Sequence, residues 1–341
     1  MSVLGAPLSW LYGAGVSLRN RHFDRTPGAS TKLPAKVVSV GNLTVGGSGK
    51  TPFVAALARE LLGRGEPVAV LSRGYARRSH SPFVLVSDGR RILASAEECG
   101  DEPLELARGA PGLAVAVGPD RAAVGRELLE KLGPHLLLLD DGFQHRRLRR
   151  DIDLVCFDAR EPVRRLHLLP RGRLREPLES LSRAHAVVWT RSSKDAPSEE
   201  LRRLVGGAAP DLPSILTRNR LVGFASLDGS ESLGAETFRG RKVGVLLGIA
   251  RPERVAESIP ADIVFTAARP DHHWWDRSEV EALAEEAKRK GAEALLTTGK
   301  DAVKLDSEPF ARSAVPLYVI RMETEILDPS VLRGLLGRLR R

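Results

Sequence analysis

The chain has 341 residues and a formal net charge of +9, and its 42% hydrophobic and 28% charged residues are ordinary for a globular protein of one large or two medium domains. Two cysteines, Cys99 and Cys156, exclude a disulfide framework and stand in no metal-ligand spacing, so we expect a reducing compartment. No apolar run reaches the length of a membrane span and no secretory leader is visible, so we expect a cytoplasmic protein.

The N-terminal 25 residues follow a helical pattern with four leucines on one face, namely Leu4, Leu8, Leu11 and Leu18. Trp10 and Tyr12 lie near this face and basic residues follow it, a combination typical of helices that lie in a membrane interface. A plain helix packed on the core is the alternative, because Pro7 and two glycines weaken the helix.

From Lys36 to about Arg191, apolar runs of strand length alternate with helical patterns such as Arg121–Leu132. This alternation predicts a parallel sheet covered by helices on both faces, whose ligands gather at the carboxyl ends of the strands. The expected strands are Val37–Val40, Val68–Leu71, Leu113–Val117, Leu136–Leu139, Leu154–Phe157 and Ala186–Thr190.

A second α/β unit is expected after a zone rich in Pro, Gly and Ser at residues 192–213. Two short strand-like pieces, Ser214–Thr217 and Leu221–Ala225, form a linker or hinge between the units. The second unit has strands Lys242–Leu247, Ile263–Thr266, Ala294–Thr298 and Leu317–Ile320, with helices near Pro252–Ser258 and Ser278–Lys290. The expected division is an N-terminal helix (1–25), a first α/β domain (26–213), a linker (214–225) and a smaller C-terminal α/β domain (226–341).

The segment 38–52 predicts a phosphate-binding P-loop. An apolar strand runs into a glycine-rich turn that ends in Gly49-Lys50-Thr51, and a helical pattern opens directly behind it. In such a loop, backbone N–H groups and a helix N-terminus face the phosphates, the lysine adds positive charge and the hydroxyl holds Mg²⁺, so the expected ligand is a nucleoside triphosphate. The general motif has glycine five residues before Gly49, where this chain has Thr44, and a tight turn without a ligand is the alternative.

Two pairs of carboxylates stand at places where a P-loop enzyme needs them. Asp140 and Asp141 directly follow an apolar strand, where such enzymes hold Mg²⁺ or its waters. Because side chains alternate along a strand, we expect one of the two to face the metal and the other a neighbouring loop. Asp101 and Glu102 precede a helical pattern, where Asp101 is either a helix N-cap or the group that takes the proton of an acceptor hydroxyl.

A histidine pair, His272 and His273, follows a strand of the second unit. No further His or Cys stands at ligand spacing, so we do not expect structural zinc. The segment is either an exposed turn with two aromatic residues or the source of a histidine that reaches the P-loop across a cleft.

Two shorter motifs add candidates. Arg73 and Tyr75 follow the second strand, where they either contact nucleotide and phosphate or form a simple loop. Lys300 and Asp301 are adjacent in the chain, which does not match the spacing of a guanine-reading motif, so guanine specificity is not supported.

The excess positive charge is concentrated between Arg146 and Arg175, where ten arginines accompany only four acidic residues. Nucleic acid, an anionic membrane surface and a phosphorylated substrate are partners that suit such a stretch, and a solvated basic surface is the remaining alternative. Aromatic residues make up only 5% of the chain and none alternate with these arginines, which disfavours nucleic acid.

Together these motifs resemble one family, the tetraacyldisaccharide 4′-kinases of lipid A biosynthesis. The matching stretches run in order through nearly the whole chain and are Val40–Pro52, Leu71–Tyr75, Gly100–Pro103, Asp140–His145, Leu169–Pro177, Gly248–Ala250, Asp271-His272 and Lys300–Lys304. The glycine-rich block and the Asp-Asp-Gly-Phe-Gln-His block are the specific ones. Thr44 is itself typical of this family, so the departure from the general P-loop pattern supports the resemblance.

The resemblance implies a kinase that transfers the γ-phosphate of ATP, with Mg²⁺, to the 4′-hydroxyl of tetraacyldisaccharide 1-phosphate to form lipid IVA. It also implies a P-loop NTPase-like α/β/α domain joined by a β linker to a smaller α/β/α domain. The enzyme is then expected as a peripheral protein on the cytoplasmic face of the inner membrane, with the N-terminal helix in the membrane surface. The expected partners are the acylated lipid substrate and an anionic membrane surface, with no nucleic acid, and the chain is expected as a monomer.

By family likeness, Asp101 is the base, His272 assists it and Lys50 binds the β- and γ-phosphates. The residues expected to bind the nucleotide are Gly46, Gly47, Ser48, Gly49, Lys50, Thr51 and Tyr75. The residues expected to serve Mg²⁺ are Thr51, Glu102, Asp140 and Asp141. The residues expected to contact the substrate are Asn42, Arg73, His145, Arg173 and Arg175. Which of Arg171, Arg173 and Arg175 meets the γ-phosphate stays open.

Two other functions remain as alternatives to a lipid kinase. A P-loop GTPase or metallochaperone needs the guanine-reading motif that this sequence lacks. A nucleic-acid-stimulated ATPase would use the arginine-rich stretch, and stimulation of ATP turnover by DNA or RNA would reveal it.

Overall fold

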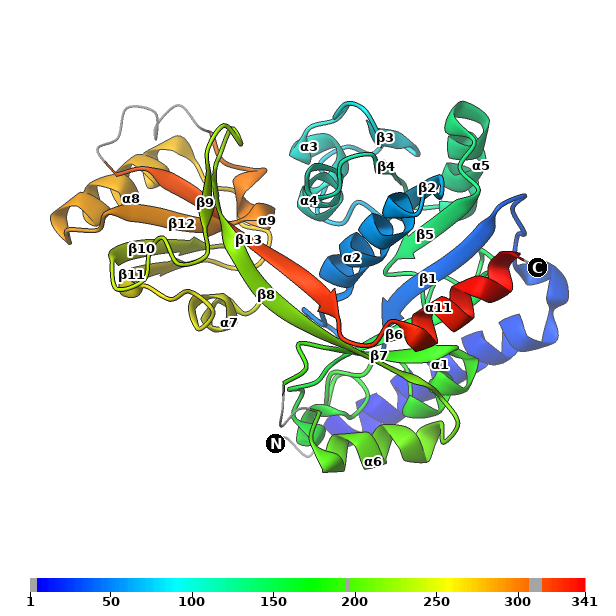
Figure 1. Ribbon diagram of the computed structural model, residues 1–341. Coiled ribbons are helices and arrows are strands. Elements are labelled where there is room, and N and C mark those ends of the chain that lie inside the picture. Colours follow the sequence, from blue (N-terminus) through cyan, green and yellow to red (C-terminus); the bar gives the residue numbers. More distant parts are fainter. Residues whose placement is uncertain (1–4, 194–196, 307–314, 341) are drawn as a thin grey trace.

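The computed structural model describes residues 5–193, 197–306 and 315–340. Two groups of parallel strands are joined into one continuous sheet, so the molecule has a large half and a small half (Figure 1). The strands of the large half lie in the order β8-β7-β6-β1-β5-β2-β4-β3, and all neighbours are parallel except β3 and β4. Their bounds are β1 (Lys36–Asn42), β2 (Val68–Ser72), β3 (Val84–Asp88), β4 (Ala114–Val117), β5 (Leu136–Asp140), β6 (Ile152–Asp158), β7 (Ala186–Thr190) and β8 (Ser214–Ser226).

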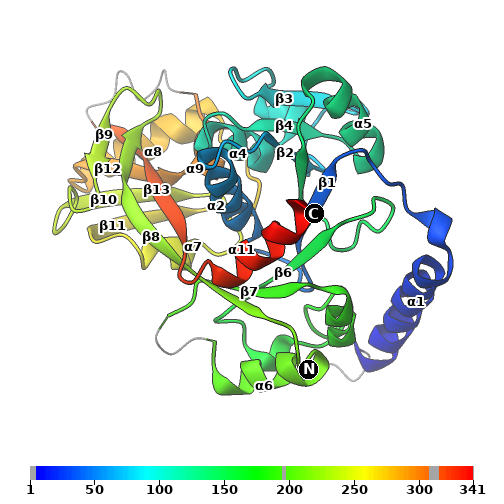
Figure 2. The same cartoon turned by 45° about the vertical axis from the view of Figure 1, so that its right-hand side comes forward.

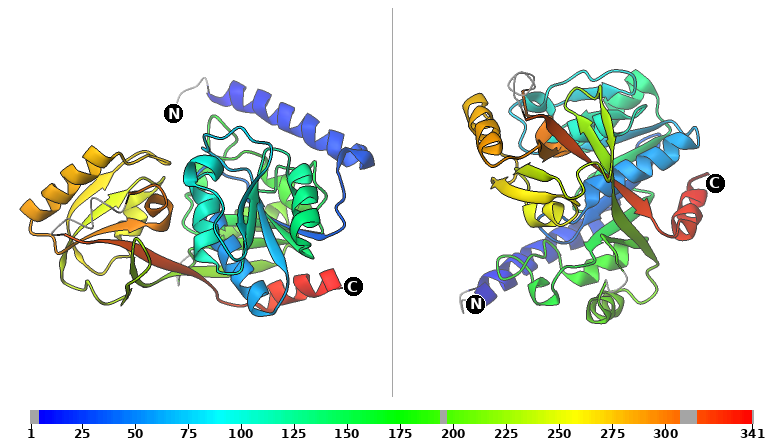
Figure 3. Two further views of the ribbon diagram at one scale, coloured as in Figure 1. Left: turned by 90° about the horizontal axis from the view of Figure 1, so that it is seen from above. Right: turned by 60° about the vertical axis from the view of Figure 1, so that its left-hand side comes forward.

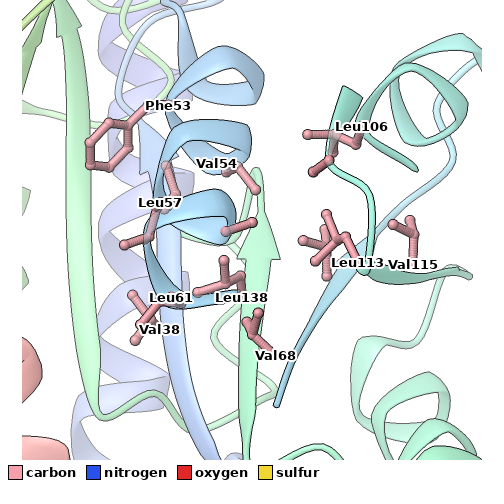
Figure 4. Close-up of a cluster of buried hydrophobic side chains, with 14 of the residues drawn as sticks. Val38, Phe53, Val54, Leu57, Leu61, Val68, Leu106, Leu113, Val115 and Leu138 are labelled. Atoms are coloured by element: carbon pink, nitrogen blue, oxygen red, sulfur yellow. The ribbon is translucent and has the colours of Figure 1, made fainter. Parts of the chain in front are cut away.

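Helices cover both faces of the large half, because successive side chains of its buried strands point to opposite sides. Leu138 of β5 packs with α2 (Lys50–Gly63) and α4 (Asp101–Gly109) on one face. Its neighbour Leu137 packs with α5 (Arg121–Leu132) on the other face. Figure 4 shows part of the first core, where apolar side chains of α2 lie beside those of the strands. The expected parallel α/β sheet is confirmed, and its carboxyl ends remain available to ligands.

The small half repeats this arrangement around four parallel strands. They are β10 (Lys242–Leu247), β11 (Asp262–Ala268), β12 (Ala294–Thr298) and β13 (Leu317–Ile326), in the order β11-β10-β12-β13. The accompanying helices are α7 (Pro252–Ala256), α8 (Arg277–Arg289) and α9 (Gly299–Ala302). The apolar stripe of α8 packs against the strands and builds the core of this half.

A two-stranded ribbon joins the halves (Figure 1). The start of β8 pairs in parallel with β7, and the remainder pairs antiparallel with β13. The short β9 (Ser232–Gly234) adds to the far end of β8. The two strand pieces expected between residues 214 and 225 are therefore one long strand, β8, and β13 is the second strand of the ribbon.

The C-terminal helix α11 (Ser330–Gly337) returns from the small half to the large half. Its buried leucines, Leu332, Leu335 and Leu336, belong to the same core as α2 and the strands of the large half. This differs from the expected C-terminal domain of residues 226–341. The physical reason is that the apolar side of this amphipathic helix is buried on the large half, beyond the end of β13.

Helix α1 (Gly5–Arg25) lies apart from both groups of strands (Figure 2). Among the described residues, no buried apolar cluster includes a residue of α1. Hydrogen bonds attach it instead: Ser9 Oγ donates to Leu168 O at 3.0 Å and Tyr12 OH donates to Arg175 O at 2.9 Å. Leu4 of the expected apolar face lies outside the described residues. The alternative of a helix packed on the apolar core therefore finds no support.

The remaining elements are short. They are α3 (Ala96–Cys99), α6 (Glu199–Ala208) and the 3₁₀ turns η1 (Pro27–Ala29), η2 (Val163–Arg165), η3 (Leu178–Arg183) and η4 (Arg338–Arg340). Viewed from two further sides, α1 and α11 lie on different sides of the large half (Figure 3). No helix in the described part of the chain is both long and apolar enough to cross a membrane.

Candidate active site

The carboxyl ends of both groups of parallel strands open into one cleft of about 1730 Å³. The large half lines it with the P-loop, Asp140, Asp141 and the start of α4, and the small half lines it with Ile249–Arg251, Asp271-His272 and the start of α9. A pocket for a single small ligand measures roughly 300–1,000 Å³. The cleft therefore has room for a nucleotide together with part of a second substrate.

The buried side chain of Asn42 holds the P-loop in place through two hydrogen bonds. Asn42 Nδ2 donates to Thr44 O at 2.6 Å and to Ser48 Oγ at 2.7 Å, while Thr190 Oγ1 donates to Ser48 O at 2.7 Å. Gly49, which precedes α2, has φ +78°, and a Cβ at this position would lie 3.0 Å from the Thr190 side chain, so a larger residue is disfavoured there. Asn42, expected to contact substrate, thus makes the contacts of a residue that shapes the loop.

The unusual Thr44 has a local explanation. It is buried and forms an isolated antiparallel bridge with Leu174, and the neighbouring Val45 N donates to Arg173 O at 2.8 Å. The Arg173 guanidinium donates to Val45 O and to Glu161 at 2.9 Å. Thr44 therefore stands in a strand-like pairing, which accepts a β-branched side chain, and Arg173 supports the loop from behind.

Asp141 is paired with two cations. Its carboxylate lies 3.5 Å from Lys50 Nζ and accepts hydrogen bonds from Arg175 at 2.8 and 3.1 Å. Burial raises the pKa of this carboxyl, but Lys50 and Arg175 outweigh burial and hold the pKa well below its usual range. Of the three arginines left open by the sequence, Arg175 is the one that lines the cleft among the residues described there, whereas the Arg171 backbone N–H donates to Ser9 on α1 at 3.1 Å.

Asp140 is the opposite case. It is buried, and its Oδ1 atom has no hydrogen-bond partner. Burial, together with the charge of Glu102, raises the pKa of Asp140 to about 7, although Lys50 opposes this. The two aspartates therefore differ in their partners: Asp141 is paired with Lys50 and Arg175, whereas Asp140 has an oxygen without a hydrogen-bond partner. Both line the same cleft, and which of them faces the metal stays a prediction.

The residues expected at the Mg²⁺ site suit that ion when it arrives with a nucleotide. All four, namely Thr51, Glu102, Asp140 and Asp141, line the same cleft as the P-loop, although Asp141 is already paired with two cations. Among the described residues no group of three or more His, Cys, Asp or Glu side chains encloses a metal position by itself. Mg²⁺ is usually held by one or two carboxylates, waters and substrate phosphates, so a cage made only of protein is not required.

A carboxylate–imidazole pair forms across the two halves. His272 Nδ1 lies 3.0 Å from both carboxylate oxygens of Asp101, at the start of α4, and Lys304 Nζ donates to Asp101 Oδ2 at 3.1 Å. Burial raises the pKa of Asp101, but the hydrogen bond from His272 and the charge of Lys300 outweigh it and bring the pKa to about 2. His272 lines the cleft, and the buried Asp101 lies behind it.

The loop that carries His272 is fixed by both halves. His272 has φ +65° and its backbone N–H donates to Gly248 O at 3.3 Å, while its ring lies 5.1 Å from that of Tyr75. Trp274, two residues on, packs under the Arg78 guanidinium at 4.7 Å. His273 Nε2 makes a hydrogen bond with Glu279 of its own half at 2.7 Å, whereas His272 contacts Asp101 of the other half. The two adjacent histidines therefore have different partners.

Basic side chains also gather beyond the aspartates. Arg73 lines the cleft, and His145 has a buried Nε2 without a hydrogen-bond partner. Burial and the nearby charge of Arg121 lower the pKa of His145 to about 4, so its ring is neutral near pH 7. Arg121, a buried residue at the start of α5 whose Nε has no partner, was missed by sequence reasoning. Its position directly after β4, at a strand carboxyl end, was the signal available.

Much of the positive charge between Arg146 and Arg175 is used inside the molecule. Ion pairs join Arg146 to Asp24, Arg150 to Asp153 and Arg173 to Glu161. The sequence also did not predict a cluster beside the P-loop in which Asp158 and Glu161 hold arginines of both halves, namely Arg173, Arg191, Arg251 and Arg254. Part of the arginine-rich stretch is therefore used in ion pairs within the protein.

The contrast between the two aspartates predicts opposite effects on stability. The pKa of Asp140 in the folded protein is above its unfolded value, so its ionisation costs stability, increasingly from about pH 4 and fully above about pH 7. Asp140→Asn should therefore stabilise the metal-free protein by about 1–3 kcal/mol at pH 8 and by less at pH 5. The pKa of Asp141 is shifted down, so its stabilisation is present throughout this range and is lost only in acid. Asp141→Asn should destabilise the protein at both pH values.

Urea unfolding of the two variants and the wild type, without metal and at both pH values, measures these effects. A loss of stability in Asp140→Asn at pH 8 equal to that in Asp141→Asn would show that Asp140 is as well paired as its neighbour.

Comparisons with known proteins identify the family of this chain. The family model LpxK, described as Tetraacyldisaccharide-1-P 4′-kinase, matches residues 1–340. The tetraacyldisaccharide 4′-kinase of Anaeromyxobacter sp. (strain K) is 43% identical over 336 residues, covering 96% of this chain and 88% of the relative. That of Geobacter sulfurreducens is 41% identical over 344 residues, covering 99% and 93%. A crystal structure of "apo" form LpxK from Aquifex aeolicus in complex with ATP superposes with a TM-score of 0.76 at 30% identity and 98% coverage of both chains. The chain therefore belongs to the family of tetraacyldisaccharide-1-phosphate 4′-kinases, as its sequence motifs predicted.

Proposed function

We propose that the cleft between the halves carries out the reaction of this family, the transfer of the γ-phosphate of ATP to the 4′-hydroxyl of tetraacyldisaccharide 1-phosphate to form lipid IVA. The observation that carries the assignment of roles is the contact of His272 with Asp101 at 3.0 Å beside a P-loop. A phosphate-binding loop alone binds a nucleotide, whereas an imidazole that lines the same cleft and is paired with a buried carboxylate behind it gives the acceptor hydroxyl a place to leave its proton.

The phosphate donor belongs on the large half. The backbone N–H groups of Gly46–Thr51 and the N-terminus of α2 face the triphosphate, and Lys50 neutralises the β- and γ-phosphates. Mg²⁺ supplies further neutralisation of the charge that spreads over the transferred group. Thr51, Glu102 and the free oxygen of Asp140 would hold it, while Asp141 keeps Lys50 and Arg175 in place.

The acceptor meets the pair formed by Asp101 and His272. Phosphoryl transfer has a loose transition state, so positioning and charge stabilisation matter more than a strongly basic group. The low pKa of Asp101 is therefore compatible with its role: the pair orients the hydroxyl and takes its proton late in the reaction. Arg73 lines the cleft together with Tyr75, which covers His272. Arg121 lies within electrostatic reach of Arg73, and His145 within reach of Arg121, so these three side chains suit the polar head of the disaccharide.

A substrate with acyl chains resides in a membrane, so the enzyme has to reach a membrane surface. Helix α1 is the element suited to contact that surface. Trp10 is 73% exposed, and Leu8, Leu11 and Leu18 on the same helix are each more than half exposed. Polar contacts hold the helix to the segment that also carries Arg175, which lines the cleft. We propose a peripheral protein on the cytoplasmic face of the inner membrane, with α1 in the anionic surface. We also propose that the chain acts as a monomer.

Lys50→Ala should reduce the transfer of labelled γ-phosphate to the acylated disaccharide by at least about 10²-fold, because one preorganised charge on the transferred group is lost. The assay contains ATP, Mg²⁺ and the lipid in detergent, with product mass as readout. Lys32→Ala, an exposed lysine before β1, is the control and should keep the wild-type rate. Undiminished transfer by Lys50→Ala would remove the P-loop from the reaction.

Replacing Leu8, Trp10, Leu11 and Leu18 by serine should release the protein from vesicles that contain anionic phospholipid, because the exposed apolar face of α1 is lost. Sedimentation with vesicles and circular dichroism test binding and folding together. The matched control replaces two exposed residues far from α1, Ile92 and Leu93, by serine and should leave binding unchanged. Binding that survives the α1 substitutions would identify another surface as the anchor.

A further inference from the structure

We propose that Lys304 is a positioning residue for Asp101, which makes phosphate transfer depend on the contact between the two halves. The inference rests on the proposed function of Asp101 and His272. Lys304 lies in the turn that ends α9 in the small half, whereas Asp101 begins α4 in the large half, 203 residues earlier. The position of Lys304 in the sequence, three residues after Asp301, does not indicate this role.

Both charged groups are removed from water. The side chain of Lys304 is 1% exposed and that of Asp101 is 3% exposed, and their charged atoms are 3.1 Å apart. Leaving either of two buried charges without its partner is strongly unfavourable, whereas a buried pair as a whole contributes little net stability. The contact is therefore better explained by what it does to Asp101 than by a need to hold the fold together.

Lys304 also contacts a second buried carboxylate, in its own half. Its Nζ lies 3.5 Å from Asp301, whose side chain is 0% exposed. Asp301 accepts hydrogen bonds from Gly248 N at 3.0 Å, Trp275 Nε1 at 3.1 Å and Thr298 Oγ1 at 2.9 Å. It is thus a fixed anchor, and Lys304 bridges from this anchor to the carboxylate of the other half.

The same anchor also sets the position of His272. Gly248, which donates to Asp301, accepts a hydrogen bond from the backbone N–H of His272 at 3.3 Å. Asp101 is therefore held between two groups of the small half, the imidazole and the ammonium, which share one rigid support. A carboxylate fixed from two sides has its oxygens oriented before substrate binds, which is the condition for effective proton transfer.

Two lysines of the small half, Lys300 in α9 and Lys304 in the turn after it, each contact a different carboxylate at the start of α4. Lys300 Nζ donates to Glu102 at 3.2 Å and to Asp271 at 2.8 Å, and lies 3.4 Å from His272 Nε2. Lys304, four residues later, takes Asp101. The small half thus places one cation on the Nε2 side of the imidazole and another behind the carboxylate, so separation of the halves would remove both.

Lys304→Met tests the proposal, because it keeps the length of the side chain and removes its charge. We expect kcat for transfer to the lipid to fall about 10²-fold while KM for ATP stays within about twofold, because the P-loop is untouched. Lys304→Arg should recover part of the loss. Lys288→Met, an exposed lysine on α8 of the same half, is the control and should retain wild-type kinetics.

A double-mutant cycle with Asp101→Asn separates positioning from a merely structural role. If Lys304 acts through Asp101, the double variant should be no slower than Asp101→Asn, within about twofold. Losses that multiply, or a kcat of Lys304→Met equal to that of the control, would overturn the inference. Full kcat in Asp101→Asn would instead contradict the proposed function itself.

The cycle also covers the case in which Lys304→Met does not fold. Removing both partners eliminates the unpaired charge of Asp101, and Asp301 keeps its three other hydrogen bonds, so the double variant should fold and have the rate of Asp101→Asn. A double variant that fails to fold while Asp101→Asn folds would show that Lys304 is needed for the structure and not for Asp101.

Discussion

The contact between Asp101 and His272 is the interaction that requires the two halves to lie together. Its two members come from different halves, 171 residues apart, and meet at 3.0 Å. The continuous sheet makes this possible: β8 and β13 run from one half to the other, and α11 returns from the end of β13 to the core of the large half. The carboxyl ends of both groups of strands consequently face one cleft, which the large half lines with the P-loop and at which the two halves together form the proposed acid–base pair.

The three aspartates in and beside this cleft differ in how many cations neutralise their charge. Asp141 is neutralised by Lys50 and Arg175, so it fixes the cations that face the phosphates. Asp140 is buried with a free oxygen, which is unfavourable in the absence of a cation and therefore suits a site that Mg²⁺ completes. Asp101 is surrounded by Lys304 and His272 and is ready in its ionised form.

The sequence predicted most of the fold because its signals are local. The parallel strands, the P-loop before α2 and the helix α5 follow from apolar runs, glycines and helical periodicity. Edge strand β3, the single long β8 and the return of α11 were not predicted, because they depend on pairing with distant elements. In the same way, Asp140 and Asp141 could be found from their place after β5, but their opposite environments depend on Arg175, 34 residues away. Lys304 belongs to a stretch that matches the family and Arg121 follows β4, but neither position indicates which distant carboxylate or histidine the side chain lies near. The residue roles inferred from family likeness remain proposals that the geometry supports.

The most direct test of this account is a single-turnover measurement on Asp101→Asn, with enzyme in excess over ATP and saturating lipid acceptor. It separates nucleotide binding from the chemical step, which steady-state rates combine. The account predicts that the variant binds ATP with wild-type affinity and transfers its γ-phosphate at least about 10²-fold more slowly, because only the pair that receives the proton is lost. A variant that binds ATP poorly but transfers phosphate at the normal rate once bound would contradict it and make Asp101 a nucleotide-binding residue.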